Sequence, residues 1–238
     1  MTKNRRPKTE DRRLPLRICV PVIETTVRRA RGLYLRAARR GLWTEMRLDY
    51  LDKPDLARLF RTRPGPVIAT NRRGDEGGRW RGTEGRRLML LEECLAYGVD
   101  FLDVELAADA AWRRSLMERR GNTGIILSWH DFAGTPEMGR LEEVLEEMLA
   151  TEAQIVKIVT LAKQPEDSLQ VLSLIPRAKA RGREIIAFCM GPLGKWSRLV
   201  APLLGSFLTF APFSKKGASA PGQLTVNDLH RLWRVLKT

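Results

Sequence analysis

One lysine stands where a charged side chain is costly. Lys157 is the charged residue of the apolar segment 154–159, which reads QIVKIV. Burying an ammonium group in such a strand costs several kcal/mol unless it is paired, and burial lowers its pKa toward the neutral amine that forms an imine with a ketone. The segment therefore marks Lys157 as a candidate nucleophile. The alternative is a lysine that points outward at the strand end and pairs with a helix carboxylate.

Histidine is scarce in this chain, which contains two. His130 is followed by Asp131 at the end of a predicted strand, where an imidazole with a pKa near neutrality suits general acid-base chemistry. The alternative is a hydrogen-bonded structural histidine. His230 falls in the last helical segment, where a surface position is expected. Glu76, in the loop DEGG at 75–78, could hold the imidazole or simply belong to a turn.

Three arginines follow three different predicted strands. They are Arg47, Arg72 and Arg198. The planar guanidinium group matches carboxylates and phosphates, so a site that gathers these side chains should favour a small anion. Each arginine has the alternative of an ordinary surface salt bridge.

The elements that must position these residues follow one repeating pattern. Short apolar or β-branched segments predict eight strands, at 17–22, 44–48, 66–70, 101–106, 124–129, 154–160, 184–190 and 206–210. Each is followed, directly or after a loop, by a segment with helical spacing of apolar residues: 27–40, 55–60, 84–97, 108–118, 141–151, 167–181, 196–204 and 226–236. Apolar strands that alternate with helices indicate a parallel sheet covered by helices.

Eight such units in 238 residues match the count and the size of a closed (β/α)8 TIM barrel. We therefore predict a single-domain α/β barrel over residues 14–238, preceded by a disordered or loosely attached basic arm at 1–13. The sequence contains no linker that would divide it into two domains. The competing architecture is an open, doubly wound sheet.

In a barrel of this kind the site forms at the carboxyl ends of the strands and in the loops that follow them. This rule alone selects a set of charged and polar residues. They are Glu45, Arg47, Asp49, Arg72, Glu76, Glu105, His130, Asp131, Lys157, Arg198, Ser219 and Gln223. Because the strand ends meet at one mouth, we expect these side chains to lie close together.

The net charge of +14 is distributed unevenly. Residues 1–40 contain thirteen Lys and Arg against three Asp and Glu, so they carry +10, and the remaining 198 residues carry +4. Such an excess is typical of proteins that bind nucleic acid or anionic membranes. The basic arm has no interleaved aromatic residues, however, so a nucleic-acid partner is not expected.

Composition indicates a globular protein, since 43% of the residues are hydrophobic and no run approaches the ~20 apolar residues that span a bilayer. The basic N-terminus is not followed by the apolar segment of a signal peptide, so we expect a cytoplasmic protein. Cys19, Cys94 and Cys189 are odd in number and widely spaced, which favours reduced core thiols over disulfides or a zinc site.

Six short motifs lie within these segments. They are EMRLD at 45–49, EGG at 76–78, DVEL at 103–106, SWHDF at 128–132, IVKI at 155–158 and SAPGQ at 219–223. In this order and at this spacing they resemble the type I 3-dehydroquinate dehydratases of the shikimate pathway. The resemblance extends from Arg17 to the C-terminus.

The resemblance implies a (β/α)8 barrel that dehydrates 3-dehydroquinate to 3-dehydroshikimate by syn elimination through a Schiff base. Lys157 would form the imine, His130 would donate and accept the proton, and Glu76 would support the imidazole. The residues expected to hold the substrate are Glu45, Arg47, Arg72, Arg198, Ser219 and Gln223. Members of this family need no metal or other cofactor and are commonly homodimers.

Two positions depart from the family pattern. Pro21 lies near the place of a serine that contacts the substrate in family members, and the bulky Trp129 precedes His130. If Trp129 faces inward, it narrows the pocket.

Two other functions are compatible with the sequence. One is another imine-forming barrel lyase, such as a sugar-phosphate aldolase, which predicts a phosphate-binding turn near 216–219; the other is a non-catalytic nucleic-acid-binding protein.

Overall fold

The computed structural model describes residues 16–236, so the predicted arm at 1–13 lies outside the described residues. Within this part of the chain, eight parallel strands form one sheet in the order β7-β6-β5-β4-β3-β2-β1-β8. They are β1 (Ile18–Val22), β2 (Trp43–Arg47), β3 (Val67–Thr70), β4 (Phe101–Glu105), β5 (Gly124–Asp131), β6 (Ile155–Leu161), β7 (Glu184–Met190) and β8 (Thr209–Phe210). Between β7 and the segment entering β8, the Phe207 N–H donates to the Ile185 carbonyl at 2.7 Å.

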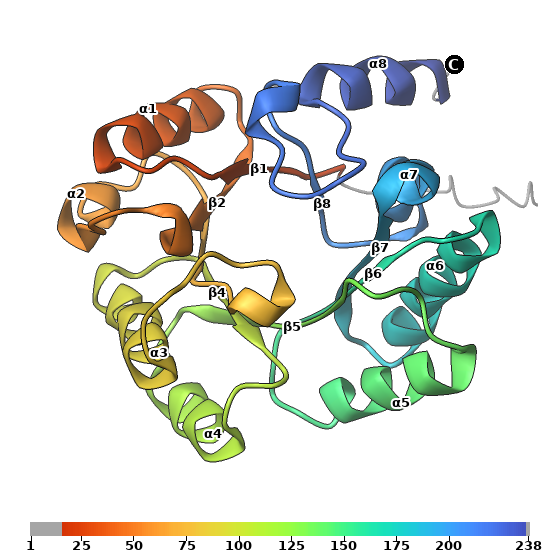
Figure 1. The fold of residues 1–238 in the computed structure, drawn as a ribbon, viewed down its shortest axis with the longest axis horizontal. Coiled ribbons are helices and arrows are strands. Elements are labelled where there is room, and N and C mark those ends of the chain that lie inside the picture. The colour runs from red at the N-terminus through yellow and green to blue at the C-terminus, as the bar shows by residue number, and fades with distance from the viewer. Residues whose placement is uncertain (1–15, 237–238) are drawn as a thin grey trace, which may run out of the picture.

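The α-helices lie around the outside of the strands in chain order (Figure 1). They are α1 (Val27–Ala38), α2 (Leu56–Phe60), α3 (Glu84–Glu93), α4 (Ala110–Arg119), α5 (Met138–Leu149), α6 (Pro165–Ala180), α7 (Gly191–Val200) and α8 (Val226–Leu236). Short 3-10 helices are η1 (Leu48–Tyr50), η2 (Gly74–Glu76), η3 (Cys94–Tyr97), η4 (Ala201–Leu204) and η5 (Lys215–Gly217). The predicted (β/α)8 barrel is confirmed, and the open doubly wound sheet is wrong.

The seventh helix begins earlier than the sequence pattern indicated. The helical segment was predicted to begin at Trp196. In the structure α7 begins at Gly191, with Pro192 in its first turn. Proline is tolerated there because the first N–H groups of a helix have no partner within the helix. The last strand is shorter than predicted, with pairing to β1 limited to Thr209 and Phe210.

Three aromatic rings fill the amino-terminal end of the barrel. Trp43, Phe101 and Phe207 start or precede strands, and their ring centroids lie 5.6 to 5.8 Å apart. Gly124 leaves the space for one of them, because a Cβ there would lie 2.3 Å from Cε1 of Phe101. This end is therefore a packed apolar plug, and the polar interior lies toward the other end.

Polar side chains gather on the interior face toward the carboxyl ends of the strands. Lys157 is aligned with Ser128 on the neighbouring strand, and Ser128 is aligned with Glu105 on the next. Parallel register places aligned residues on the same face of the sheet, so these three side chains share the interior. All three are buried. The fold thus places charged groups in the buried interior, at the end of the barrel where a site is expected.

Two smaller predictions concern cysteines and membranes. Cys19, Cys94 and Cys189 are all buried and unbridged, as expected for core thiols. Among residues 16–236, no helix is both long enough and apolar enough to cross a membrane.

The aromatic plug gives a test of the packing at the base of the barrel. Replacing Gly124 with alanine should lower the free energy of unfolding by about 1 to 3 kcal/mol, because the new methyl group meets the ring of Phe101. Urea denaturation measures this change. Gly32→Ala in α1 is the matched control, since no atom lies within 4 Å of a Cβ built there. Equal effects in both variants would contradict the packing explanation.

Candidate active site

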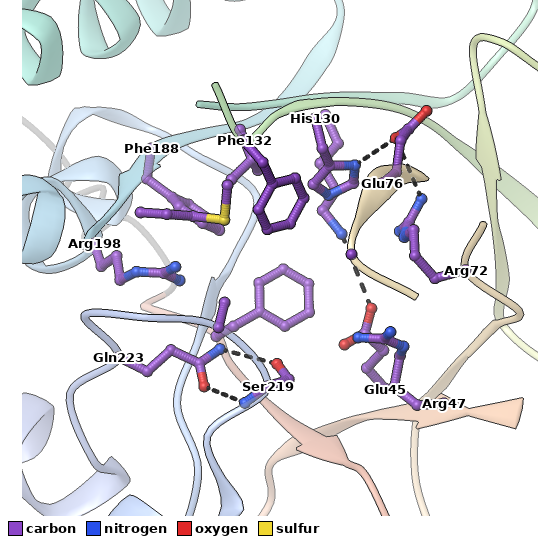
Figure 2. Close-up of a pocket in the computed structure, with 16 residues that line it drawn as sticks. Glu45, Arg47, Arg72, Glu76, His130, Phe132, Phe188, Arg198, Ser219 and Gln223 are labelled. Atoms are coloured by element: carbon purple, nitrogen blue, oxygen red, sulfur yellow. Dashed lines mark hydrogen bonds and ion pairs between the residues drawn. The ribbon is translucent and has the colours of Figure 1, made fainter. Parts of the chain in front are cut away.

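One pocket at the carboxyl ends of the strands is lined by all nine residues that the family resemblance implies for the site (Figure 2). Of the wider set selected by the carboxyl-end rule, Asp49, Glu105 and Asp131 are not among its lining residues. Its polar lining is Glu45, Arg47, Arg72, Glu76, His130, Lys157, Arg198, Ser219 and Gln223. The remaining lining residues are Gly77, Phe132, Val159, Phe188, Met190, Phe210 and Ala220. Polar and apolar residues therefore line the same cavity, which suits a carbon ring carrying several polar groups.

Lys157 points into the barrel from β6. Its ammonium nitrogen lies 2.8 Å from Oδ2 of Asp103, 3.9 Å from Oε1 of Glu45 and 4.6 Å from the ring centroid of Phe210. The side chain is almost entirely buried. The outward-facing lysine paired with a helix carboxylate is therefore wrong, because the partner is a strand residue on the same interior face.

Asp103 joins the lysine to the guanidinium of Arg72. Nη2 of Arg72 lies 2.7 Å from Oδ1 of Asp103, and Nη1 donates to Glu105 at 3.1 Å and to the Ser128 hydroxyl at 2.7 Å. Burial alone would raise the pKa of Asp103, but Arg72 and Lys157 hold it well below its usual range. Asp103 is thus a carboxylate held ionised between two cations.

Arg47 is also paired with a carboxylate of the protein. Its Nε and Nη2 atoms donate to the two carboxylate oxygens of Asp49 at 2.9 and 2.7 Å. Asp49 accepts further backbone N–H bonds from Arg72 and Arg79. The Arg47 guanidinium therefore lines the pocket as a fixed donor whose charge is already balanced.

Arg198 differs from the other two arginines. It is 1% exposed, it stacks on Phe188 at 4.4 Å, and within residues 16–236 its Nε and Nη2 atoms have no hydrogen-bond partner. Burial without a carboxylate lowers its pKa to about 9. Figure 2 shows the side chain reaching into the pocket opposite Glu76 and Arg72. An incoming carboxylate would supply the missing partner.

His130 and Glu76 form a buried pair, with Nδ1 of the imidazole 2.8 Å from Oε2 of Glu76. Burial lowers the pKa of His130 well below its usual value, and the charges of Arg72 and Lys157 lower it further. Burial also raises the pKa of Glu76 to about 7, although Arg72 opposes this shift. The imidazole is therefore neutral near pH 7, as a proton acceptor must be.

Two glycines let the loop after β3 fold back and place Glu76. Gly77 has a φ of 77°, and a Cβ there would lie 2.4 Å from Cζ of Phe132. A Cβ at Gly78 would lie 2.0 Å from the carbonyl oxygen of Arg72. A side chain at either position would push Glu76 away from the imidazole, which explains the motif EGG in physical terms.

The segment after β8 covers one side of the pocket. The Gln223 amide accepts from the Ser219 N–H at 3.0 Å and donates to the Ser219 hydroxyl at 3.2 Å. Gly222 packs against the start of α7, where a Cβ would lie 2.2 Å from the Gly191 carbonyl oxygen. The Ser219 N–H is thus already satisfied within the loop, unlike the free N–H groups of the phosphate turn that an aldolase would use here.

Sequence reasoning missed the importance of Asp103. Its signal was present, because Asp103 and Glu105 are two residues apart in an apolar strand and must share one face.

The sequence also did not decide whether Trp129 faces the pocket. That residue packs against the apolar core and is not among the residues lining the pocket, so it does not narrow the site. Pro21 is buried and aligned with Glu45, so it faces the interior without a polar group.

Comparison with known proteins agrees with this geometry. The family model for type I 3-dehydroquinase matches residues 18–238. The chain belongs to the type I 3-dehydroquinase family. It is 41% identical over 173 residues to the 3-dehydroquinate dehydratase of Syntrophobacter fumaroxidans, covering 72% of this chain and 73% of the relative. It is 33% identical over 227 residues to that of Methanocaldococcus jannaschii, covering 92% and 98%.

Solved structures place the chain in the same family. The crystal structure of 3-dehydroquinate dehydratase from Geobacillus kaustophilus superposes with a TM-score of 0.83 at 29% identity, covering 93% of this chain and 91% of that one. 3-Hexulose-6-phosphate synthase from Salmonella typhimurium superposes with a TM-score of 0.57 at 15% identity, which shows the barrel fold alone. As a member of the 3-dehydroquinase family, the chain is an enzyme of the hydro-lyase type.

The raised pKa of Glu76 predicts a pH dependence of stability. Because folding raises the pKa of Glu76 to about 7, the folded protein holds this proton more tightly, and the contribution of Glu76 to stability falls as the pH rises from about 4.5 to 7. Glu76→Gln removes that loss. The variant should match wild type at pH 5 and exceed it in free energy of unfolding by about 1 to 3 kcal/mol at pH 8. Denaturant titrations at both values measure the difference.

The control for this prediction lies on the same loop. Arg73 lowers the pKa of the exposed Asp75, so Asp75→Asn should give no gain in stability at pH 8. If Glu76→Gln shifts stability equally at pH 5 and pH 8, the raised pKa of Glu76 is refuted.

Proposed function

We propose that this chain converts 3-dehydroquinate to 3-dehydroshikimate and water through an imine on Lys157. The observation that carries the proposal is one buried pocket joining three features: Lys157, the neutral imidazole of His130 and the unpaired guanidinium of Arg198. A ketone that also bears a carboxylate and a removable proton would use all three. Membership of the 3-dehydroquinase family supports the same reaction.

The first step uses the amine of Lys157. Attack on the C3 ketone, followed by loss of the ketone oxygen as water, joins nitrogen to C3 as a protonated imine. Asp103 lies 2.8 Å from this nitrogen, so its negative charge can stabilise the cation that forms. The protonated imine draws electrons from the neighbouring carbon and thereby acidifies the C2 hydrogen.

The second step belongs to His130. When Glu76 is ionised, the Nδ1–H of His130 donates to it, and Nε2 keeps a free lone pair to accept the C2 proton. The electrons of the C2–H bond move toward the imine and then expel the C1 hydroxyl, which takes the proton from the imidazolium and leaves as water. Hydrolysis of the imine consumes one water and restores the amine, so the net reaction releases one water.

The remaining polar residues would hold the substrate. Arg198 would pair with its carboxylate, because it is the guanidinium in the described pocket without a protein partner. The groups that would contact the hydroxyls are Glu45, Arg47, Arg72, Ser219 and Gln223. The apolar rings of Phe188 and Phe210 also line the pocket and would pack against the carbon ring.

The proposal has further parts, of which the absence of a cofactor and the dimer come from the family resemblance. The covalent imine with Lys157 takes the place of a cofactor, so no metal or coenzyme is required. The enzyme would act as a homodimer in the cytoplasm, with no membrane or nucleic-acid partner.

Two exposed leucines support the dimer. Leu169 on α6 is 60% exposed and Leu193 on α7 is 44% exposed, and these two helices contact each other, which supports an apolar subunit contact. Sedimentation equilibrium distinguishes the dimer from the monomer.

Trapping with borohydride tests the imine. Wild type incubated with 3-dehydroquinate and sodium borohydride should gain a ligand adduct on Lys157, detected by mass spectrometry of the labelled peptide. Lys157→Ala should show no adduct and no ultraviolet absorbance from the conjugated product. His130→Ala should lose ~10² to 10⁴ in kcat, whereas the exposed His230→Ala should retain full activity. An active Lys157→Ala variant would overturn the mechanism.

Arg198 predicts opposite effects on stability and binding. A buried cation without a carboxylate is costly, so Arg198→Leu should raise the free energy of unfolding of the ligand-free protein by about 1 to 3 kcal/mol. The same variant should raise KM and lose the thermal shift that substrate gives wild type. Thermal denaturation with and without ligand measures both effects. A variant that is less stable yet binds normally would contradict the assigned role.

A further inference from the structure

A second buried arginine lies behind the pocket. Arg87, on α3, is 1% exposed and is not among the pocket-lining residues. Its Nε and Nη2 atoms donate to the two oxygens of Glu84 at 2.8 Å each, and its Nη1 donates to Glu105 at 2.8 Å and to the Asn71 carbonyl. Because this guanidinium is buried and bonded through Nε, Nη1 and Nη2, it holds the groups that it bonds in fixed positions.

Arg87 fixes the position of Arg72 indirectly, through two of its hydrogen bonds. Asn71 is the residue immediately before Arg72, so the bond to its carbonyl fixes the backbone from which the Arg72 side chain starts. Glu105 accepts from Arg87 with Oε2 and from Arg72 with Oε1, so the bond to Glu105 fixes the partner of the Arg72 guanidinium. Both contacts act on the same pocket residue.

The effect reaches Lys157 through alternating charges. Arg87 lies 2.8 Å from Glu105, Glu105 lies 3.1 Å from Arg72, Arg72 lies 2.7 Å from Asp103, and Asp103 lies 2.8 Å from Lys157. Because Arg87 supplies part of the charge that Glu105 needs, Arg72 remains shared between Glu105 and Asp103. Asp103 is then only partly available to the ammonium of Lys157, which also faces Glu45 of β2 at 3.9 Å and shares the pocket with His130 of β5.

We propose that Arg87 is a positioning residue that sets the proton affinity of Lys157 by holding Glu105 and the Asn71 backbone against Arg72. Without Arg87, Glu105 would draw Arg72 toward itself and release Asp103 to Lys157. The ammonium form of Lys157 would then be stabilised, and the free amine would appear only at higher pH. This role rests on the proposed function of Lys157, but the proton affinity of Lys157 can be measured without turnover.

The test compares Arg87→Met with Glu84→Gln. Labelling with acetic anhydride across a pH series, with mass spectrometry of the Lys157 peptide, gives the midpoint at which the amine becomes reactive. Arg87→Met should move this midpoint, and the acidic limb of kcat/KM, upward by roughly one pH unit. It should also lower kcat by about 10- to 100-fold, since the catalytic groups are displaced. Glu84→Gln removes the charge of the outer, half-exposed partner of Arg87 but keeps an acceptor oxygen, so it should leave midpoint and limb unchanged.

A conservative variant separates charge from geometry and serves if Arg87→Met does not fold. Arg87→Lys keeps the positive charge but cannot reach Glu84, Asn71 and Glu105 at once, so the midpoint should shift less while kcat still falls. A folded Arg87→Lys with wild-type midpoint and rate overturns the inference, as does an unchanged midpoint in Arg87→Met. If wild type does not turn over 3-dehydroquinate, the proposed function fails and the labelling midpoints still decide the role of Arg87.

Discussion

The burial of a lysine amine beside a carboxylate is the constraint on which the site depends. Lys157 lies 2.8 Å from Asp103 in the buried interior of the barrel, where an unpaired charge of either sign is expensive. Arg72, 2.7 Å from the other oxygen, shares that carboxylate with the lysine. The surrounding charges therefore act directly on the amine that we propose as the nucleophile.

The barrel divides its two ends between stability and chemistry. Aromatic packing of Trp43, Phe101 and Phe207 fills the amino-terminal end, where buried apolar area stabilises the fold. The carboxyl end instead carries buried charges that stabilise it little or cost free energy. The loop glycines at 77 and 78 add a further requirement, since they bring Glu76 to the imidazole by close backbone contact. The apolar end thus contributes the packing that stabilises the fold, and the charged end contributes the site.

The barrel and the residues of the candidate site were predictable from the sequence, because each of these predictions needs only one element at a time. The spacing of apolar residues predicts a strand, and the carboxyl end of that strand predicts where a site residue lies. Lys157 and His130 were recognisable from apolar runs that end in polar residues. Which charges pair was not predictable, because pairing depends on distances between strands 25 to 56 residues apart in sequence, as for Arg72 with Ser128 and Thr70 with Glu45. Trp129 illustrates the same limit, since only the register of β5 decides which face it takes.

Pairing is what separates three arginines that look equivalent in sequence. Arg47 is neutralised by Asp49, and Arg72 by Asp103 and Glu105, so each can donate hydrogen bonds without adding net charge. Arg198 alone among them remains unpaired within the described residues. A ligand carboxylate therefore meets one uncompensated cation in a buried site, where its attraction is strongest and its orientation is fixed. The chain's overall charge of +14 plays no part in that choice, because the excess lies mostly in residues 1–40.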